Sequence, residues 1–136
     1  MVELIGGCDA AREYILASIE RGKHVVTANK ALLAHHGNDI LAAAAANQVE
    51  IAFEASVGGG IPIIAAIGQC LSANQIRSIH AILNGTSNYI LTQMREKGSS
   101  FADALAEAQK LGYAEADPTF DVEGIDAAHK LTLLAS

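Results

Sequence analysis

Apolar and polar positions in the first part of the chain form short apolar runs separated by longer mixed segments. Three of the runs each predict a strand: residues 2–5, 24–28 and 50–55. Helices are expected at residues 9–21, capped by Asp9 and closed by Gly22, and at residues 38–47. Strands alternating with helices in this way predict a parallel sheet with crossover helices. Such sheets bind ligands at the carboxyl ends of their strands.

The pattern changes after Val57. Three consecutive glycines followed by Pro62 predict a domain joint and then a helix to about Cys70. Residues 76–83 alternate apolar and polar side chains, so they predict a strand with one exposed face. Helices are expected further on at residues 87–97, at residues 100–111 with a capping box formed by Ser100 and Asp103, and from residue 124 to the end.

Both ends of this pattern look cut. A three-stranded parallel sheet with no strand before Val2 has little protection at its edge. The last helix is still apolar where it stops at Ser136, and it has no capping signal. We therefore expect the sequence to be a segment of a longer protein.

The amino-acid composition limits the classes of protein to which this chain can belong. Hydrophobic residues make up 51% of the chain and charged residues 18%, which excludes a disordered protein. No apolar run approaches the roughly 18 residues of a membrane span, and the N-terminus lacks the features of a signal peptide. The net charge of −6 argues against a nucleic-acid partner. Cys8 and Cys70 form neither a disulfide framework nor a metal pattern, which favours the cytoplasm.

The segment "LGYAEADPTFDVEGIDAAHK", residues 111–130, concentrates candidate chemistry. It contains five carboxylates and, at its end, Lys130; the carboxylates are Glu115, Asp117, Asp121, Glu123 and Asp126. Asp126 and Lys130 share a helix face, and as a surface pair they would contribute only about 0.2–0.5 kcal/mol. In a partly desolvated pocket, the same lysine can deliver a proton to a developing alkoxide. Both readings stay open from the residues alone.

Two other places carry alternatives. Lys30 follows a predicted strand, where it is either a solvated charge or a group facing a ligand crevice. Glu54 and the glycine run after it form either a flexible joint or a carboxylate-and-carbonyl site for a monovalent cation. The stretch "NGTSN", residues 84–88, predicts a turn with Thr86 or Ser87 as a helix cap.

Four segments, in order and spacing, resemble the homoserine dehydrogenases: "GKHVVTANKALLA", "FEASVGGGIPII", "ILNGTSNYILTQM" and the acidic segment 111–130. The resemblance covers essentially the whole chain. It implies an oxidoreductase that interconverts L-homoserine and L-aspartate 4-semialdehyde with NAD(P)H, on the route to threonine, methionine and isoleucine. It also implies a small-molecule substrate and a homo-oligomer, dimer or tetramer, without nucleic acid or membrane.

The resemblance implies roles for individual residues. Lys130 would be the acid–base lysine, and Lys30 would lie where cofactor and substrate meet. Glu115 and Asp126 would bind the substrate. The cofactor would lie against Gly6, Gly7, Cys8, Lys30 and Gly112. A sodium or potassium ion would be held by Glu54 and by the backbone carbonyls of Val57, Gly59 and Ile61. Asp117, Asp121 and Glu123 would order the loop or support these groups.

The fold implied is α/β: the C-terminal part of a Rossmann-type parallel sheet, followed by the start of an α+β catalytic domain. The domains would be residues 1–56, an incomplete NAD(P)-binding domain, and residues 57–136, an incomplete catalytic domain. The family's G-x-G-x-x-G turn is absent, so these residues alone are expected to be inactive, and the choice between NAD and NADP stays open. Alternatives are another two-domain nicotinamide oxidoreductase, a bifunctional aspartokinase–homoserine dehydrogenase, and a non-catalytic remnant.

Overall fold

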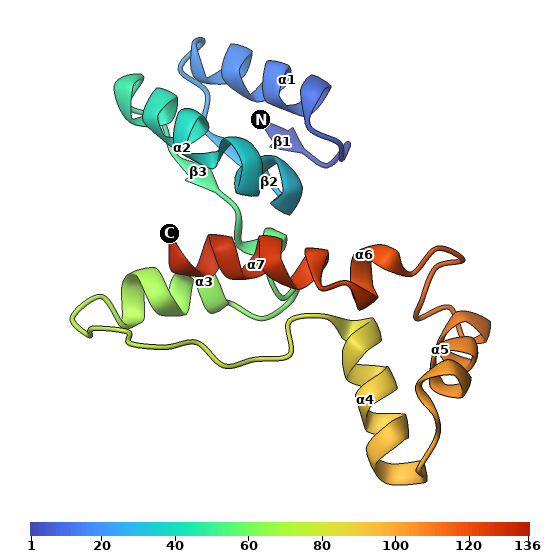
Figure 1. Ribbon diagram of the computed structural model, residues 1–136. Helices are drawn as coiled ribbons and strands as arrows, with labels where there is room; N and C mark the ends of the chain where they lie inside the picture. Colours follow the sequence, from blue (N-terminus) through green and yellow to red (C-terminus); the bar gives the residue numbers. More distant parts are fainter. The chain divides into compact units, whose positions relative to one another are not determined.

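The structure is a computed structural model that describes residues 1–136 (Figure 1). The chain forms two compact units. The first contains residues 1–75 together with residues 132–136, and the second contains residues 76–131. None of the helices is long and apolar enough to cross a membrane.

A parallel sheet of three strands organises the first unit. The strands β1 (Val2–Glu3), β2 (Val25–Thr27) and β3 (Ile51–Ala52) lie in the order β1-β2-β3. Val26 pairs with Val2 on one side and with Ala52 on the other. The predicted parallel sheet is therefore confirmed, with strands shorter than the apolar runs suggested.

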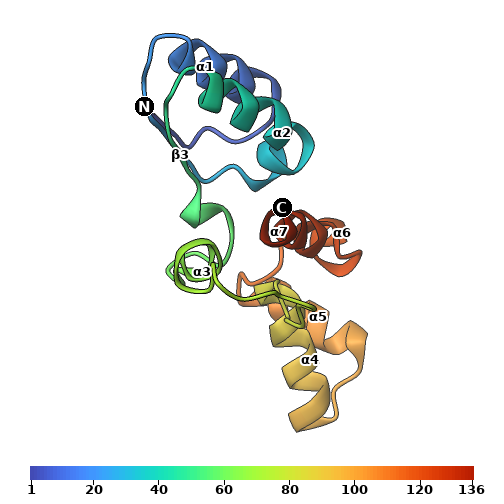
Figure 2. The same cartoon turned by 90° about the vertical axis from the view of Figure 1, so that its left-hand side faces the viewer.

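Two helices, α1 (Asp9–Ile19) and α2 (Lys30–Ala46), pack against each other beside this sheet (Figures 1 and 2). Val25 and Thr27 of β2 are buried, whereas Val26 between them is 46% exposed. The sheet thus has one covered face and one open face. The core consists of side chains that are fully buried or nearly so: Ala11, Ile15, Ile19, Val25, Leu32 and Ile40.

The predicted start of the second helix was wrong. Residues 38–47 were expected to be helical, but α2 begins eight residues earlier, at Lys30. The physical reason is a cap, because the side-chain oxygen of Asn29 accepts a hydrogen bond from the backbone N–H of Leu32 at 3.1 Å. The predicted cap of the first helix was off by one residue, since Asp9 is its first residue and Cys8 occupies the N-cap position.

After β3 the chain forms three short helical turns. They are η1 (Glu54–Ser56), α3 (Ile63–Ala65) and a π-helical turn η2 (Ala66–Cys70) that continues α3. The helix predicted from Pro62 to about Cys70 is confirmed in its extent. Gly58 and Gly60 adopt φ values of 61° and 82°, a left-handed conformation that favours glycine.

The second unit is helical. Its elements are α4 (Gly85–Lys97), α5 (Phe101–Lys110), α6 (Thr119–Val122) and the first part of α7 (Ile125–Ala135). Ile90, Ala104, Ala108 and Ala114 form its apolar core. Gly98 closes α4 with φ 66°, and the Ser100 hydroxyl caps α5 by accepting the backbone N–H of Asp103 at 3.1 Å. These two predicted helix boundaries are confirmed.

The strand predicted at residues 76–83 is wrong. The segment has no regular secondary structure, and Ile76 and Ile82 are 45% and 57% exposed. Alternating side chains become a strand only where a neighbouring strand supplies hydrogen bonds, and the sheet of this structure contains only β1, β2 and β3. The short helix α6 was not predicted either.

Candidate active site

Asp126 and Lys130 meet at the start of α7. The ammonium of Lys130 donates hydrogen bonds to Asp126 Oδ2 at 2.6 Å and to the carbonyl oxygen of Leu83 at 2.7 Å. The Lys130 side chain is 19% exposed and the Asp126 side chain 8%, so the pair is partly removed from water. An ammonium has three N–H donors, and the two protein acceptors leave one of them for a ligand.

Asn84, the N-cap residue of α4, bridges two carboxylates. Its side-chain nitrogen donates to Asp121 Oδ1 at 2.7 Å and to Asp126 Oδ2 at 2.9 Å. Its side-chain oxygen accepts the backbone N–H of Ser87 at 2.7 Å. The amide orientation follows from these partners, because a flipped amide would set its oxygen against both carboxylates. The predicted cap, Thr86 or Ser87, was therefore wrong.

Thr86 contributes a further contact to Asp121. Its hydroxyl oxygen lies 2.9 Å from Asp121 Oδ2 and 2.6 Å from the carbonyl oxygen of Tyr113. Both neighbours are acceptors, and a hydroxyl carries one hydrogen, so only one of them receives it at a time. Thr86 thus links the acidic segment at Tyr113 and Asp121 to the first turn of α4.

These groups line a solvent-open depression of about 680 Å³. Gly112, Asp121, Asp126 and Lys130 lie along it, so three of the predicted site residues come together there: Gly112, Asp126 and Lys130. Glu115 is exposed and does not line the depression. Its part in substrate binding remains a prediction.

The hydrogen-bonded side chains of Asn84, Asp121, Asp126 and Lys130 form a cluster with more acidic groups than basic ones. With Asp121 and Asp126 ionised, two negative charges face the single positive charge of Lys130, which leaves the cluster net negative. A cationic group of a ligand therefore finds acceptors here, and a carbonyl oxygen finds a donor. The arrangement suits acid–base chemistry on a small molecule that carries an ammonium group.

Two tyrosines lie at the same depression. The rings of Tyr89 and Tyr113 are 4.9 Å apart. Burial, and then the nearby Glu107 carboxylate, raise the pKa of Tyr89 above its ordinary value. Both causes act against ionisation of the phenol.

A second hydrogen-bonded network surrounds Glu3 in the first unit. The Glu3 carboxylate, 3% exposed, accepts the backbone N–H groups of Ile5 at 2.8 Å and Gly6 at 3.3 Å. It also accepts the hydroxyl of Thr27 at 2.5 Å. A buried carboxylate is stable when its oxygens are bonded in this way. Glu3 thereby fixes the loop that follows β1 to the end of β2.

Asn29 completes this network, and sequence reasoning missed it. Its side-chain nitrogen donates to the carbonyl oxygen of Gly7 at 2.6 Å, while its oxygen caps α2. Gly6, Gly7 and Lys30, all predicted cofactor residues, line a depression of about 310 Å³ at the carboxyl ends of β1 and β2. Cys8 is half-buried at the N-cap of α1 and does not line it.

The glycine loop offers space for a ligand. Gly6 and Gly7 have φ values of 71° and 69°, and a Cβ added to either would meet no other atom within 4 Å. The backbone is therefore open to a group lying in the depression, as a nucleotide cofactor requires. The residues present here fit such a cofactor.

Glu54 acts first as a helix cap. Its two carboxylate oxygens accept the backbone N–H groups of Ile64 at 2.8 Å and Ala65 at 2.9 Å. Val57 is 1% exposed, and no hydrogen bond to its carbonyl oxygen or to that of Gly59 is present. Ile61 offers its oxygen to Ile63 N–H at 2.8 Å. Both oxygens of Glu54 thus already hold backbone donors, and the cation site remains a prediction.

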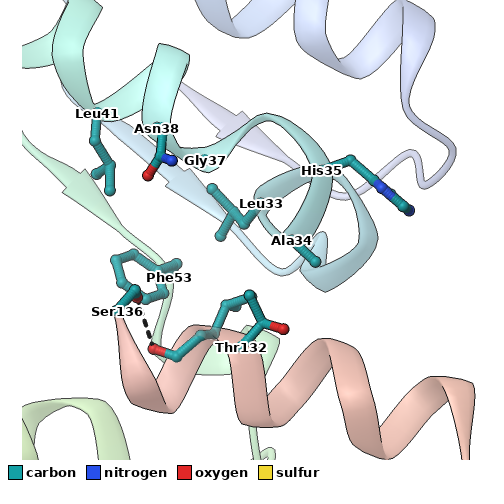
Figure 3. A pocket seen from close by; sticks show the side chains of 10 residues that line it. Leu33, Ala34, His35, Gly37, Asn38, Leu41, Phe53, Thr132 and Ser136 are labelled. Carbon is teal, nitrogen blue, oxygen red and sulfur yellow. Dashed lines mark hydrogen bonds between the residues drawn. The ribbon is translucent and has the colours of Figure 1, made fainter.

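The first unit also has an apolar depression of about 110 Å³, shown in Figure 3. Leu33, Leu41, Phe53 and Leu133 are among the residues that line it. The Ser136 hydroxyl donates to the carbonyl oxygen of Leu133 at 3.1 Å, and His35 also belongs to the lining (Figure 3). No pair of groups suited to acid–base chemistry lines it.

Comparison with known families gives two matches along the chain. Residues 62–136 match the family described as homoserine dehydrogenase. Residues 1–54 match the family described as homoserine dehydrogenase, NAD binding domain. Together the two matches cover most of the chain. The predicted domain boundary after residue 56 stays a prediction.

Individual relatives agree. The chain is 67% identical over 136 residues to a homoserine dehydrogenase of Pseudomonas aeruginosa, covering all of this chain and 31% of the relative. It is 60% identical over the same length to one of Neisseria gonorrhoeae, again covering 31% of the relative. The chain thus spans about a third of the length of the curated relatives it matches.

Solved structures have the same fold. A homoserine dehydrogenase from Thiobacillus denitrificans matches with a TM-score of 0.94 at 63% identity, covering 98% of this chain and 31% of that one. A hyperthermophilic archaeal homoserine dehydrogenase, solved in complex with NADPH, matches with a TM-score of 0.89 at 35% identity. That match covers 98% of this chain and 41% of the other.

Proposed function

The chain belongs to the homoserine dehydrogenase family, and on that premise we propose that the full-length protein interconverts L-homoserine and L-aspartate 4-semialdehyde with NAD(P)(H). This activity belongs to the synthesis of threonine, methionine and isoleucine. The observation that carries the proposal is the position of Lys130. Its ammonium is held between Asp126 and the Leu83 carbonyl oxygen, with one N–H left for a substrate oxygen.

In the reducing direction, the aldehyde carbon of the semialdehyde gains a hydride and its oxygen becomes an alkoxide. Lys130 gives that oxygen a proton, so that the product is the neutral alcohol of homoserine. In the oxidising direction, Lys130 in its neutral form takes the hydroxyl proton as the hydride leaves the same carbon. Asp126 holds the lysine nitrogen in place during both transfers.

The bound nicotinamide supplies or accepts the hydride. Gly6, Gly7 and Lys30 would lie against the cofactor at the carboxyl ends of β1 and β2, and Gly112 would border the nicotinamide. Cys8 would contribute through its position at the N-terminus of α1. Lys30 would also help to orient the substrate where it meets the cofactor.

The substrate's ammonium group would bind to carboxylates. Asp126 would accept one of its N–H groups, and the net negative charge of the cluster with Asp121 supports that assignment. Glu115 would provide a second acceptor. Asp117, Asp121 and Glu123 would order the acidic segment, and the bonds to Asp121 from Asn84 and Thr86 support this role for Asp121.

A monovalent cation, Na⁺ or K⁺, would be held by Glu54 and the carbonyl oxygens of Val57, Gly59 and Ile61. The Glu54 carboxylate, which accepts the backbone N–H of Ile64 just after the glycine run, supports this site. Removal of both ions by dialysis against a bulky organic cation should lower activity and thermal stability, and either ion should restore them. Unchanged activity and an unchanged melting temperature after dialysis would remove the site from the proposal.

We also propose that the full-length protein is a homo-oligomer, a dimer or tetramer, and that it works in the cytoplasm. The first rests on the family, and the second on the two free cysteines. Sedimentation equilibrium of the purified protein tests the first, and a monomer at micromolar concentration would contradict it. Cell fractionation tests the second, and recovery of the protein outside the cytoplasmic fraction would contradict it.

The activity has a direct test. Purified full-length protein should reduce NAD⁺ or NADP⁺ when L-homoserine is added, and the rise in absorbance of the reduced nicotinamide measures the rate. L-Serine and L-threonine serve as controls, because they carry the same ammonium and carboxylate on a different hydroxyl-bearing chain. The proposal fails if homoserine gives no more reduced cofactor than these controls do.

A further inference from the structure

Asn84 occupies a position that joins the helix cap to the candidate chemistry. Its side chain is buried, with the residue 6% exposed, and all of its hydrogen-bonding groups have partners within 3 Å. The oxygen accepts the Ser87 N–H, and the two hydrogens of the nitrogen go to Asp121 and Asp126. A helix cap alone needs only the first of these bonds.

We propose that Asn84 is a positioning residue for the acid–base lysine, acting through Asp126. This inference rests on the proposed function, since it assigns Asn84 a part in the same proton transfer. Asp126 Oδ2 receives two donors, the Asn84 amide at 2.9 Å and the Lys130 ammonium at 2.6 Å. The Asn84 amide thus fixes the Asp126 oxygen that accepts the hydrogen bond from the Lys130 nitrogen.

Electrostatics explain why an amide is needed. Asn84 lies between the carboxylates of Asp121 and Asp126, which repel each other when both are ionised. A neutral group with two N–H donors holds both of them without neutralising either. An ammonium in its place would neutralise part of the charge that favours a cationic substrate, and a hydroxyl would supply only one hydrogen.

Asn84→Asp separates the two duties of the residue. An aspartate caps a helix about as well as an asparagine, so the bond to Ser87 N–H is kept. It offers oxygen where both carboxylates require a donor, so both bridging bonds are lost. Asn84→Ser also keeps a capping side chain and loses the bridge, but adds no charge. Asn74→Asp, on an exposed turn of the first unit, is the matched control for the added charge.

The experiment compares steady-state kinetics of these variants in the full-length enzyme, over pH, in the direction of aldehyde reduction. Hydrogen bonds to charged groups are strong enough that losing the bridge should lower kcat by about 10–100-fold in both Asn84 variants. The KM for NAD(P)H should stay within about twofold, since Asn84, Asp121 and Asp126 do not line the depression formed by Gly6, Gly7 and Lys30. The pH profile should shift to higher pH in Asn84→Asp, because the added carboxylate holds the proton on the lysine.

The outcomes distinguish failure of the proposed function from failure of the inference about Asn84. If the parent enzyme shows no homoserine-dependent reduction of NAD(P)⁺, the proposed function fails, and this inference fails with it. If the parent is active and both Asn84 variants keep its kcat and pH profile, Asn84 is only a cap, and the inference alone is overturned. If Asn84→Asp has a lower melting temperature than the control, Asn84→Ser decides the question by its kcat.

Discussion

The two units of the molecule each use an asparagine in the same local role but give it different partners. Asn29 caps α2 through Leu32 N–H, and Asn84 caps α4 through Ser87 N–H. The side-chain nitrogen of Asn29 donates to a neutral backbone group, the carbonyl oxygen of Gly7, whereas that of Asn84 donates to two carboxylates. Asn29 therefore fixes a backbone loop, whereas Asn84 fixes the positions of two charged side chains.

The acidic residues of the two networks, Glu3 and Asp126, also differ in whether their hydrogen-bond partners are neutral or charged. Glu3 is bonded to two backbone amides and a hydroxyl, all of which are neutral donors. Asp126 is bonded to an amide and to an ammonium that is a candidate proton donor. The first network is suited to rigidity, because all of its donors are neutral. The second is suited to chemistry, because moving one proton changes its balance of charge.

The largest expected effect is that of Lys130→Ala in the full-length enzyme. Removal of a positioned acid should lower kcat by about 10²–10⁴-fold while leaving the KM for NAD(P)H nearly unchanged. Lys97→Ala, at the exposed end of α4, is the control and should behave like the parent. A Lys130→Ala enzyme with kcat within about threefold of the parent would assign the lysine to a simple ion pair.

The next largest effect is on the stability of the folded protein, and it tests the network around Glu3, in which all donors are neutral. Glu3→Ala leaves the N–H groups of Ile5 and Gly6 and the Thr27 hydroxyl without their acceptor. The free energy of unfolding should fall by about 1–3 kcal/mol, measured by urea denaturation of the full-length protein. Glu13→Ala, on the exposed side of α1, is the control. A Glu3→Ala protein as stable as that control would show that the loop does not depend on the carboxylate.

Asn29→Asp sharpens the comparison directly. The cap on α2 is kept, but the donor to Gly7 O is lost and a negative charge is added beside the cofactor depression. We expect the KM for NAD(P)H to rise by roughly 2–10-fold, with a smaller change in kcat. The same substitution at Asn84 should act on kcat instead. If both substitutions changed the same kinetic constant, the distinction between the two asparagines would be lost.

The smallest effect concerns Asp117 in the acidic segment. The Thr119 hydroxyl, at 2.6 Å, and then the Thr119 backbone N–H lower the pKa of Asp117 from its ordinary value of 3.8. Thr119→Ala removes the larger cause and should raise that pKa toward 3.8, as measured by NMR titration of isotopically labelled aspartate. An Asp117 pKa equal in variant and parent would show that the hydroxyl does not bind the carboxylate in solution.

The sign of the linked stability follows from the direction of the shift. The pKa of Asp117 is lower in the folded chain than in the unfolded one, so the contact stabilises the fold above the unfolded value of 3.8. That contribution is lost as pH falls through the folded pKa. The parent and Thr119→Ala proteins should therefore differ in melting temperature at neutral pH and converge in strong acid.

Local rules predicted much of this structure from sequence. The closure of α4 at Gly98 and the Ser100 cap depend on neighbours in sequence, and both are confirmed. The parallel sheet of three strands is confirmed as well, because the alternation of strands with helices predicts it. The meeting of Asp126 with Lys130 follows from their spacing on a helix. Their catalytic and binding roles, like those of the other candidate site residues, remain predictions.

Long-range contacts account for what was missed. Asn84 is separated by 37 residues from Asp121 and by 42 from Asp126, and no periodicity in sequence gives the packing that joins them. The failed strand at residues 76–83 has the same cause, since pairing depends on a partner elsewhere. The early start of α2 was available from sequence, because Asn29 is a strong N-cap residue ahead of Leu32 and Leu33.

Because Gly85 follows Asn84 in the chain, Asn84 is also a candidate for deamidation. Asparagine followed by glycine deamidates readily in flexible chains, because the glycine nitrogen can attack the side-chain amide carbon. In this fold the amide is bonded at both ends and cannot turn toward Gly85, so the native state protects it. Each unfolding episode exposes it to conversion into aspartate or isoaspartate, with loss of the bridge to both carboxylates. Peptide mass spectrometry should therefore find Asn84 intact in enzyme stored folded and converted in enzyme stored in denaturant.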